Sequence, residues 1–344
     1  MDGTGLASRH DRTAVVSNPW VLMTLALVAI AAAYPSWTDA YSLSVIRDAL
    51  IFALLALSLD YLWGKAGILS FGHAAFFGIG AYSMAIFGPK VDSANAALVG
   101  LLAGTGIAGA VALVIGYFLI FGGVRGAYLT IVTLAISLVA QHIAIGWSEV
   151  TGGDSGLIGA PPPGIEIFGF SYVILDPVHQ YYLILAVTVI ALLAIWLACR
   201  GHYGRVLAAI QDNELRARTL GYNTSLHLLI VFVVSAMLAA VAGGMYDITS
   251  GYVAPDLIGL FMSTEIIVWV AVGGRGTLIG PIIGAFVVIR LQQEVSSVSY
   301  KLWPMFIGAF FVAMVFLFPN GLLPLLRRIP RIVASRLLRT RGAE

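Results

Sequence analysis

The sequence predicts an all-α membrane protein: a polytopic helix bundle of about ten transmembrane helices with both termini in the cytoplasm. Of its 344 residues, 60% are hydrophobic and only 10% are charged, whereas soluble domains carry roughly 25% charged residues. Apolar runs of about 20 residues, the length that crosses a bilayer, recur along most of the chain. This composition excludes an ordinary soluble fold, and it excludes disorder, which needs low hydrophobicity.

Ten apolar runs are the candidate membrane spans. A polar leader, residues 1–18, precedes the first run without a small-residue cleavage site, so we interpret that run as a retained anchor. The runs cover residues 20–34, 43–62, 67–87, 95–121, 127–147, 180–199, 226–249, 257–272, 277–294 and 302–318.

The positions of lysine and arginine orient the bundle, because cytoplasmic loops retain positive charge. The loop 148–179 holds four acidic residues and no lysine or arginine, so we place it outside. The segment 200–222 carries four arginines and the tail 326–344 carries six, so we place both in the cytoplasm. The chain thus divides into a cytoplasmic leader, a membrane domain over 19–325 and a basic cytoplasmic tail.

The sequence contains no signature of catalysis or of metal binding. It lacks a Gly-x-x-x-x-Gly-Lys-Ser/Thr phosphate loop, its histidines are scattered, and its one cysteine excludes an intrachain disulfide. The string Gly153-Asp154-Ser155-Gly156 superficially matches the serine motif of rhomboid proteases. Three prolines follow within eight residues, where no helix can continue, so we interpret the string as a glycine turn. A net charge of +2 does not suggest a nucleic-acid partner.

The run 67–87 has small residues on one helical face, which lets helix backbones approach closely in a membrane and predicts a central helix. Ser70 and His73 lie in this segment, and intramembrane polar groups are candidates for a functional site. A second interpretation of His73, a hydrogen bond to a carbonyl of a neighbouring helix, stays open. Among ionisable residues Glu265 is the deepest by hydropathy, whereas Asp60, Asp247, Arg290 and Glu294 lie nearer span ends, from which they are expected to reach the interface.

The segment 200–222 reads as an amphipathic helix that ends at Gly221. Such a helix docks in a partner's groove or lies on the membrane, and its few basic residues favour the partner. Its apolar face holds Val206, Ile210, Ala217 and Leu220, and its polar face holds Arg205, Asp212, Arg216 and Thr219.

The outside loop is too long for a simple turn, and loops of this length are usually functional or disordered. Its acidic, glycine-rich part suits a docking surface, and a disordered connector is the alternative. A faint internal repeat links Gly64–Leu69 with Gly274–Leu278, since each begins a small-residue helix after a basic turn.

Four segments carry a resemblance to a known family, and in order and spacing they cover most of the chain from about 45 to 325. They are Leu69–Tyr82, Arg125–Gly153, Gly204–Gly221 and Gly273–Pro281. Together they resemble the permease subunits of bacterial ABC importers for branched-chain amino acids, specifically the longer of the two permeases. The sequence departs from that family at Asp60, where asparagine is usual, and at Gln211, where arginine is common.

The resemblance implies a non-catalytic permease domain over 19–325 in the bacterial cytoplasmic (inner) membrane. The implied partners are a second homologous permease subunit, two cytoplasmic ABC ATPase subunits and an extracytoplasmic substrate-binding protein. No cofactor is expected on this chain, because ATP and Mg would bind to the ATPase subunits. The implied cargo is a branched-chain or related amino acid, with urea or short amides as the alternative. An ion-driven secondary transporter is the competing class.

The resemblance also assigns three groups of residues. The translocation pathway would involve Ser70, Gly72, His73, Phe76, Phe77 and Glu265. Coupling to an ATPase groove would involve Arg205, Ile210, Asp212, Glu214, Ala217, Leu220 and Gly221. Docking of the binding protein would involve Thr151, Gly152, Gly153 and Asp154.

Overall fold

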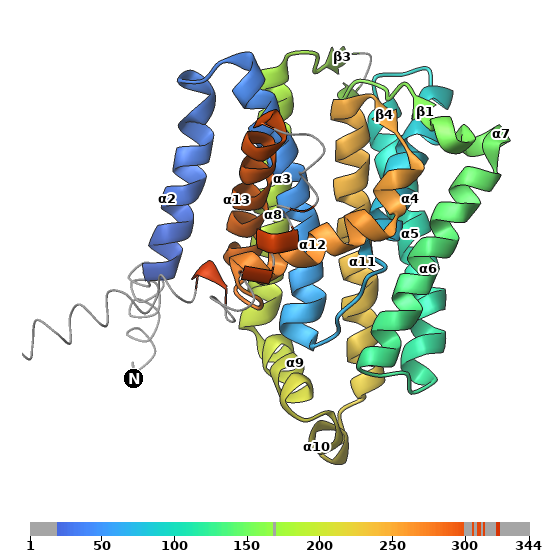
Figure 1. Ribbon diagram of the computed structural model, residues 1–344, viewed down its shortest axis with the longest axis vertical. Helices are drawn as coiled ribbons and strands as arrows, with labels where there is room; N and C mark the ends of the chain where they lie inside the picture. The colour runs from blue at the N-terminus through green and yellow to red at the C-terminus, as the bar shows by residue number, and fades with distance from the viewer. Residues whose placement is uncertain are drawn as a thin grey trace, which may run out of the picture.

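The computed structural model describes residues 19–167, 170–298, 305, 308–310, 312–313 and 321–323. These residues form a bundle of helices, with a small helical lobe at one end and short strands at the other (Figure 1). We call the lower end in Figure 1 the α10 end and the upper end the sheet end. The leader 1–18 and the tail 326–344 lie outside the described residues.

The helices follow the apolar runs closely. Each of the first nine expected spans contains one helix, and the tenth, 302–318, falls largely outside the described residues. The long helices of the bundle are α2 (Pro19–Ala33), α3 (Ala40–Asp60), α4 (His73–Phe87), α5 (Ala96–Phe121), α6 (Ala127–Gly146), α8 (Pro177–Arg200), α11 (Thr224–Ser250), α12 (Leu260–Gly273) and α13 (Ile279–Val298).

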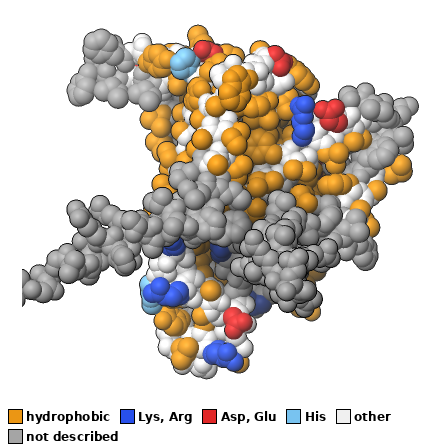
Figure 2. Space-filling model, turned by 90° about the vertical axis from the view of Figure 1, so that its left-hand side faces the viewer, with side chains coloured by type: hydrophobic (Ala, Val, Ile, Leu, Met, Phe, Trp, Pro, Cys, Tyr) orange, Lys and Arg blue, Asp and Glu red, His pale blue; other side chains and the backbone are white. Residues whose placement is uncertain are grey.

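Five helices in the described part are long and apolar enough to cross a membrane: α3 with its π-helical extension Tyr61–Lys65, α5, α6, α8 and α11. Hydrophobic side chains cover a broad band on the face shown in Figure 2, and basic side chains gather below it on the lobe. The all-helical membrane bundle is therefore confirmed. The count of ten spans and the placement of both termini stay predictions.

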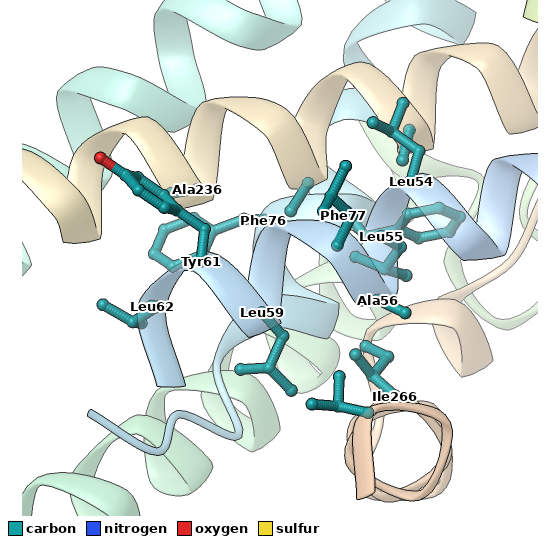
Figure 3. Packing of buried hydrophobic residues seen from close by; sticks show 14 of the residues in the cluster. Leu54, Leu55, Ala56, Leu59, Tyr61, Leu62, Phe76, Phe77, Ala236 and Ile266 are labelled. Atoms are coloured by element: carbon teal, nitrogen blue, oxygen red, sulfur yellow. The ribbon is translucent and has the colours of Figure 1, made fainter. Parts of the chain in front are cut away.

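The core lies where α3, α4, α11 and α12 meet. Figure 3 shows Phe76 and Phe77 of α4 packed among leucines of α3 and Ala236 of α11. Backbones touch here: a Cβ at Gly80 would lie 2.0 Å from the carbonyl oxygen of Ala240, and one at Gly243 would lie 1.9 Å from that of Phe77. The small residues of the 67–87 run therefore do make α4 a central helix, although α4 begins only at His73.

Short strands and one-turn helices occupy the sheet end. Strand β1 (Leu157–Ile158) pairs antiparallel with β4 (Tyr252–Val253), which joins the loop after α6 to the end of α11. Strands β2 (Gly164–Ile167) and β3 (Phe170–Val173) form a hairpin in the same loop, which begins with α7 (Ser148–Thr151). At the opposite end, α9 (His202–Asp212) and α10 (Glu214–Thr219) form the lobe between α8 and α11.

Candidate functional site

His73 is buried at the start of α4 and links three helices. Its Nε2 lies 2.6 Å from Ser235 Oγ on α11, and that hydroxyl donates a 2.6 Å hydrogen bond to the Ser58 carbonyl on α3. Because the Ser235 proton is used for Ser58, Nε2 must be the protonated nitrogen that donates to Ser235. His73 thus bonds a neighbouring helix, but its partner is the Ser235 hydroxyl and not the backbone carbonyl that the second interpretation expected.

The other expected pathway residues of the 67–87 run also lie inside the chain. Ser70 is buried and its Oγ accepts a 3.1 Å hydrogen bond from the Gly72 amide, while Thr133 of α6 accepts one from the Phe71 amide. Phe76 lies edge-on to Phe232, with 5.7 Å between ring centroids. Phe77 belongs to an aromatic cluster that its neighbours Phe52, Tyr246 and Trp269 complete. Their role in a pathway stays a prediction.

Glu265 is the one expected pathway residue that reaches the surface of the described bundle. It is partly exposed on α12, beside exposed Phe261 and Thr264. The opposite side of α12, with Ser263, Ile267 and Val270, is buried against the core. Glu265 therefore lies on the open face of α12, whereas Ser70, Gly72, His73, Phe76 and Phe77 lie behind it in the bundle interior.

Two carboxylates contradict the expectation that they reach the interface from span ends. Asp60 is fully buried, and its carboxylate accepts hydrogen bonds from the Gly276 and Leu278 amides. Asp247 is fully buried too, and neither of its carboxylate oxygens has a hydrogen-bond partner in the described part of the chain. The expectation was wrong because neighbouring segments cover both span ends, which hydropathy along one helix does not reveal.

The segment 200–222 is two helices and not one. Asn213 takes an extended conformation between α9 and α10, and its side chain caps α10 by accepting from the Arg216 amide at 2.9 Å. Val206, Ile210 and Ala217 do share an apolar face, but this chain's own core buries them, so they are not free for a partner's groove. Arg205, Asp212, Arg216 and Thr219 are exposed as expected. Leu220 was expected on the apolar face but is 71% exposed, because the break at Asn213 turns the end of α10 away from the bundle.

Glu214 is held by Arg125 of the turn between α5 and α6. Arg125 donates from Nε to Oε2 at 2.9 Å and from Nη2 to Oε1 at 3.0 Å, and Thr224 donates to Oε1 at 3.1 Å. The hydrogen bond from Arg125 is the main reason that the pKa of Glu214 lies below its ordinary value. Glu214 thus fixes α10 against the bundle.

The loop after α6 is ordered where it is described. The Thr151 hydroxyl donates to the Ala144 carbonyl at 2.5 Å, and Gly152 ends α7 in the left-handed region with φ 74°. Gly153 is buried, so Asp154 is the exposed member of the expected docking group. The Ser155 carbonyl accepts a hydrogen bond from Tyr252 across the loop. The glycine turn is confirmed, the disordered connector is not supported, and the docking role stays a prediction.

The family described as branched-chain amino acid transport system, permease component, matches residues 41–315. The chain belongs to this family. Two curated relatives are the high-affinity branched-chain amino acid transport system permease proteins LivM of Salmonella typhimurium and Escherichia coli. Each is 28% identical over 327 residues, which cover 89% of this chain and 75% of the relative.

The permease is also similar to the autoinducer 2 import system permease protein LsrC of Salmonella choleraesuis, 29% identical over 121 residues, which cover 33% of this chain and 35% of that one. No solved structure matches the permease. The resemblance inferred from the sequence is confirmed: the permease is a non-catalytic, multi-pass membrane subunit of an ABC transport system.

The sequence patterns did not predict two features of this permease. Leu215 is 71% exposed in the first turn of α10, and a pattern that assumed one continuous helix gave no sign of it. The pairing of Arg125 with Glu214 was also missed, although both residues lie in segments that carry the family resemblance. No metal-ligand cluster of His, Cys, Asp and Glu occurs within the described residues.

Proposed function

We propose that this permease is a membrane subunit of an ATP-driven importer that moves branched-chain or related amino acids into a bacterial cell through its inner membrane. Its partners are a second homologous permease, two cytoplasmic ATPase subunits, which bind ATP and Mg, and an extracytoplasmic binding protein. The family match over 41–315 carries the proposal. The lobe of α9 and α10, which projects beyond the bundle, supports it (Figure 1).

The lobe is the proposed contact with an ATPase. Leu215 in the first turn of α10 and Leu220 just after its end are large apolar side chains, each 71% exposed. Such side chains lie beyond the long apolar helices, where a protein groove can bury them but the bilayer cannot. Exposed arginines of the lobe surround them with positive charge. In this proposal the α10 end is cytoplasmic and the sheet end faces the binding protein.

Glu265 is the proposed polar contact along the pathway. It lies on the open face of α12, where a second permease would complete an enclosed path. Its carboxylate matches the ammonium group that every free amino acid carries. The buried residues Ser70, Gly72, His73, Phe76 and Phe77 would then shape the pathway from behind by holding α4 against α12 and α11.

The proposal is tested by purifying the permease from native membranes and measuring the ATPase rate of whatever assembles with it. Co-purified ATPases whose rate rises with leucine-loaded binding protein would support the amino-acid importer. An ATPase rate that rises only with urea or a short amide would support an ABC importer with a different substrate. A lone chain with ion-driven uptake in vesicles would contradict the proposal.

Glu265 is tested in the same reconstituted assembly. Glu265→Gln should lower uptake of the amino acid by about tenfold, the effect of roughly 1.4 kcal/mol, without loss of assembly. Glu294→Gln on α13 is the matched control, since that carboxylate is exposed and paired with Arg290. Equal uptake by the Glu265 variant and the control would remove Glu265 from the pathway.

A further inference from the structure

Three segments that are distant in the sequence meet at the α10 end of the bundle. They are the end of α3 with its extension Tyr61–Lys65, the turn 274–278 between α12 and α13, and α9 of the lobe. Asp60, the last residue of α3, joins the first two. Its Oδ1 accepts a hydrogen bond from the Gly276 amide at 2.5 Å and its Oδ2 accepts one from the Leu278 amide at 2.9 Å.

The turn is also held from its other side. Lys65 Nζ donates a 2.7 Å hydrogen bond to the Gly276 carbonyl, and the Arg275 guanidinium lies 5.0 Å from the centre of the Trp63 ring. A Cβ at Gly64 would lie 2.5 Å from the Gly276 nitrogen, so these two backbones touch. The end of α3 and the turn 274–278 therefore form one closely packed unit.

The backbone of the turn is strained. Leu278 has φ 63°, a left-handed conformation that a branched side chain rarely adopts. Such a residue persists where its surroundings hold it in place, and strain of this kind often accompanies a conformational role. Here the Asp60 carboxylate holds the Leu278 amide from a fully buried position.

Gln211 connects this unit to the lobe. Its side-chain Nε2 donates a 3.2 Å hydrogen bond to the carbonyl of Gly64. Gln211 of α9 therefore bonds Gly64, whose backbone packs directly on Gly276. Asp60 bonds the same turn through the Gly276 and Leu278 amides. This turn is the one that ends α12, the helix that carries Glu265.

We propose that Asp60 and Gln211 form a joint that transmits movement of the lobe to α12 and α13, with both acting as positioning residues. The inference rests on the proposed function, in which an ATPase moves the lobe. Hydrogen bonds from amides to a buried carboxylate are strong and directional, so the turn follows the end of α3 and does not slip past it. The hydrogen bond from Gln211 to Gly64 connects the lobe directly to the same unit.

The joint is tested in the assembled importer by counting the solute molecules moved per ATP hydrolysed. Asp60→Asn replaces one carboxylate oxygen by an NH2 group, which opposes an amide donor, and Gln211→Ala removes the link to α9. Each variant should lower the ratio at least about fivefold, the lower range of measured couplings between sites. Asp48→Asn, in the same helix α3 and paired with Arg47, is the matched control and should keep the wild-type ratio.

The double variant separates a joint from two independent structural defects. Because both substitutions cut the same path, Asp60→Asn with Gln211→Ala should be no worse than the worse single variant. The inference would be overturned if the two losses in the ratio of solute to ATP multiplied in the double variant and paralleled a fall in its unfolding temperature. A wild-type ratio in either single variant would also overturn it. If Asp60→Asn does not assemble, Gln211→Ala decides alone, since it removes one hydrogen bond of an exposed side chain.

The two proposals fail in distinguishable ways. A wild-type assembly whose ATPase ignores the loaded binding protein would overturn the proposed function and the joint with it. A responsive wild type, with both variants keeping its ratio of solute to ATP, would overturn the joint alone.

Discussion

Arg125 and Glu214, 89 residues apart in the sequence, form a two-pronged ion pair that closes the turn between α5 and α6 onto α10. The remaining donor of Arg125, Nη1, bonds the carbonyls of Ile120 and Val124, and the first of these belongs to the last turn of α5. One guanidinium therefore caps a helix and anchors the lobe. The position of α10 relative to the bundle depends on this pair.

Reversing either charge should loosen α10. We expect Arg125→Glu or Glu214→Arg to lower the unfolding temperature and the binding-protein stimulation of the ATPase, because each places like charges about 3 Å apart. The double exchange should restore part of both. Glu294→Arg at the exposed pair with Arg290 is the control, since such pairs contribute little. Single variants that match this control would contradict the anchoring role.

The same pair predicts a pH dependence. The pKa of Glu214 is lowered in the folded protein, chiefly by the hydrogen bond from Arg125. Its contribution to stability is therefore complete above the ordinary value of 4.5 and is lost as the pH falls through the lower folded value. We expect the difference in unfolding temperature between wild type and Glu214→Gln to be constant from pH 7 to about pH 5 and to shrink below that. A difference that grows on acidification would have the wrong sign.

Close backbone contact predicts contrasting effects of the same substitution at two glycines. Gly80→Ala should destabilise the bundle by about 1–3 kcal/mol, because its Cβ would meet the backbone of Ala240, which cannot move aside. Gly106→Ala on α5 meets nothing within 4 Å and should be neutral or stabilising by up to about 1 kcal/mol. Thermal unfolding in detergent measures both. Similar unfolding temperatures would refute the close packing of α4 on α11.

The exposed leucines of α10 predict a loss of partner binding without a loss of stability. Leu215→Ser with Leu220→Ser should weaken ATPase association by about tenfold or more, the effect expected of side chains buried at the centre of an interface. The unfolding temperature of the permease should not change, since both leucines are 71% exposed. Ile158→Ser at the sheet end, with 86% of its surface exposed, is the control. Equal association of the two variants would move the docking site elsewhere.

The amphipathic pattern of 200–222 predicts burial correctly within each short helix but not across the break between them. Val206, Ile210 and Ala217 are buried as their spacing predicts, because a helical period holds within each short helix. Leu220 is exposed because the helical period is interrupted at Asn213. The Asn213 side chain caps α10 and so starts a new helix at that point. A pattern that had treated Asn213 as a helix cap would have separated α9 from α10.

The sequence by itself determined the class of protein, the family and nearly all the helices, because the bilayer imposes long apolar runs and the family motifs occur in order along the chain. Only the tertiary structure decided what the polar residues within those runs do. His73 bonds Ser235, Arg125 binds Glu214, and Asp60 holds the turn 276–278. The partners in these pairs lie 162, 89 and 216 or more residues apart. A buried polar group must find a partner in space, and hydropathy along one segment carries no information about which segment supplies it.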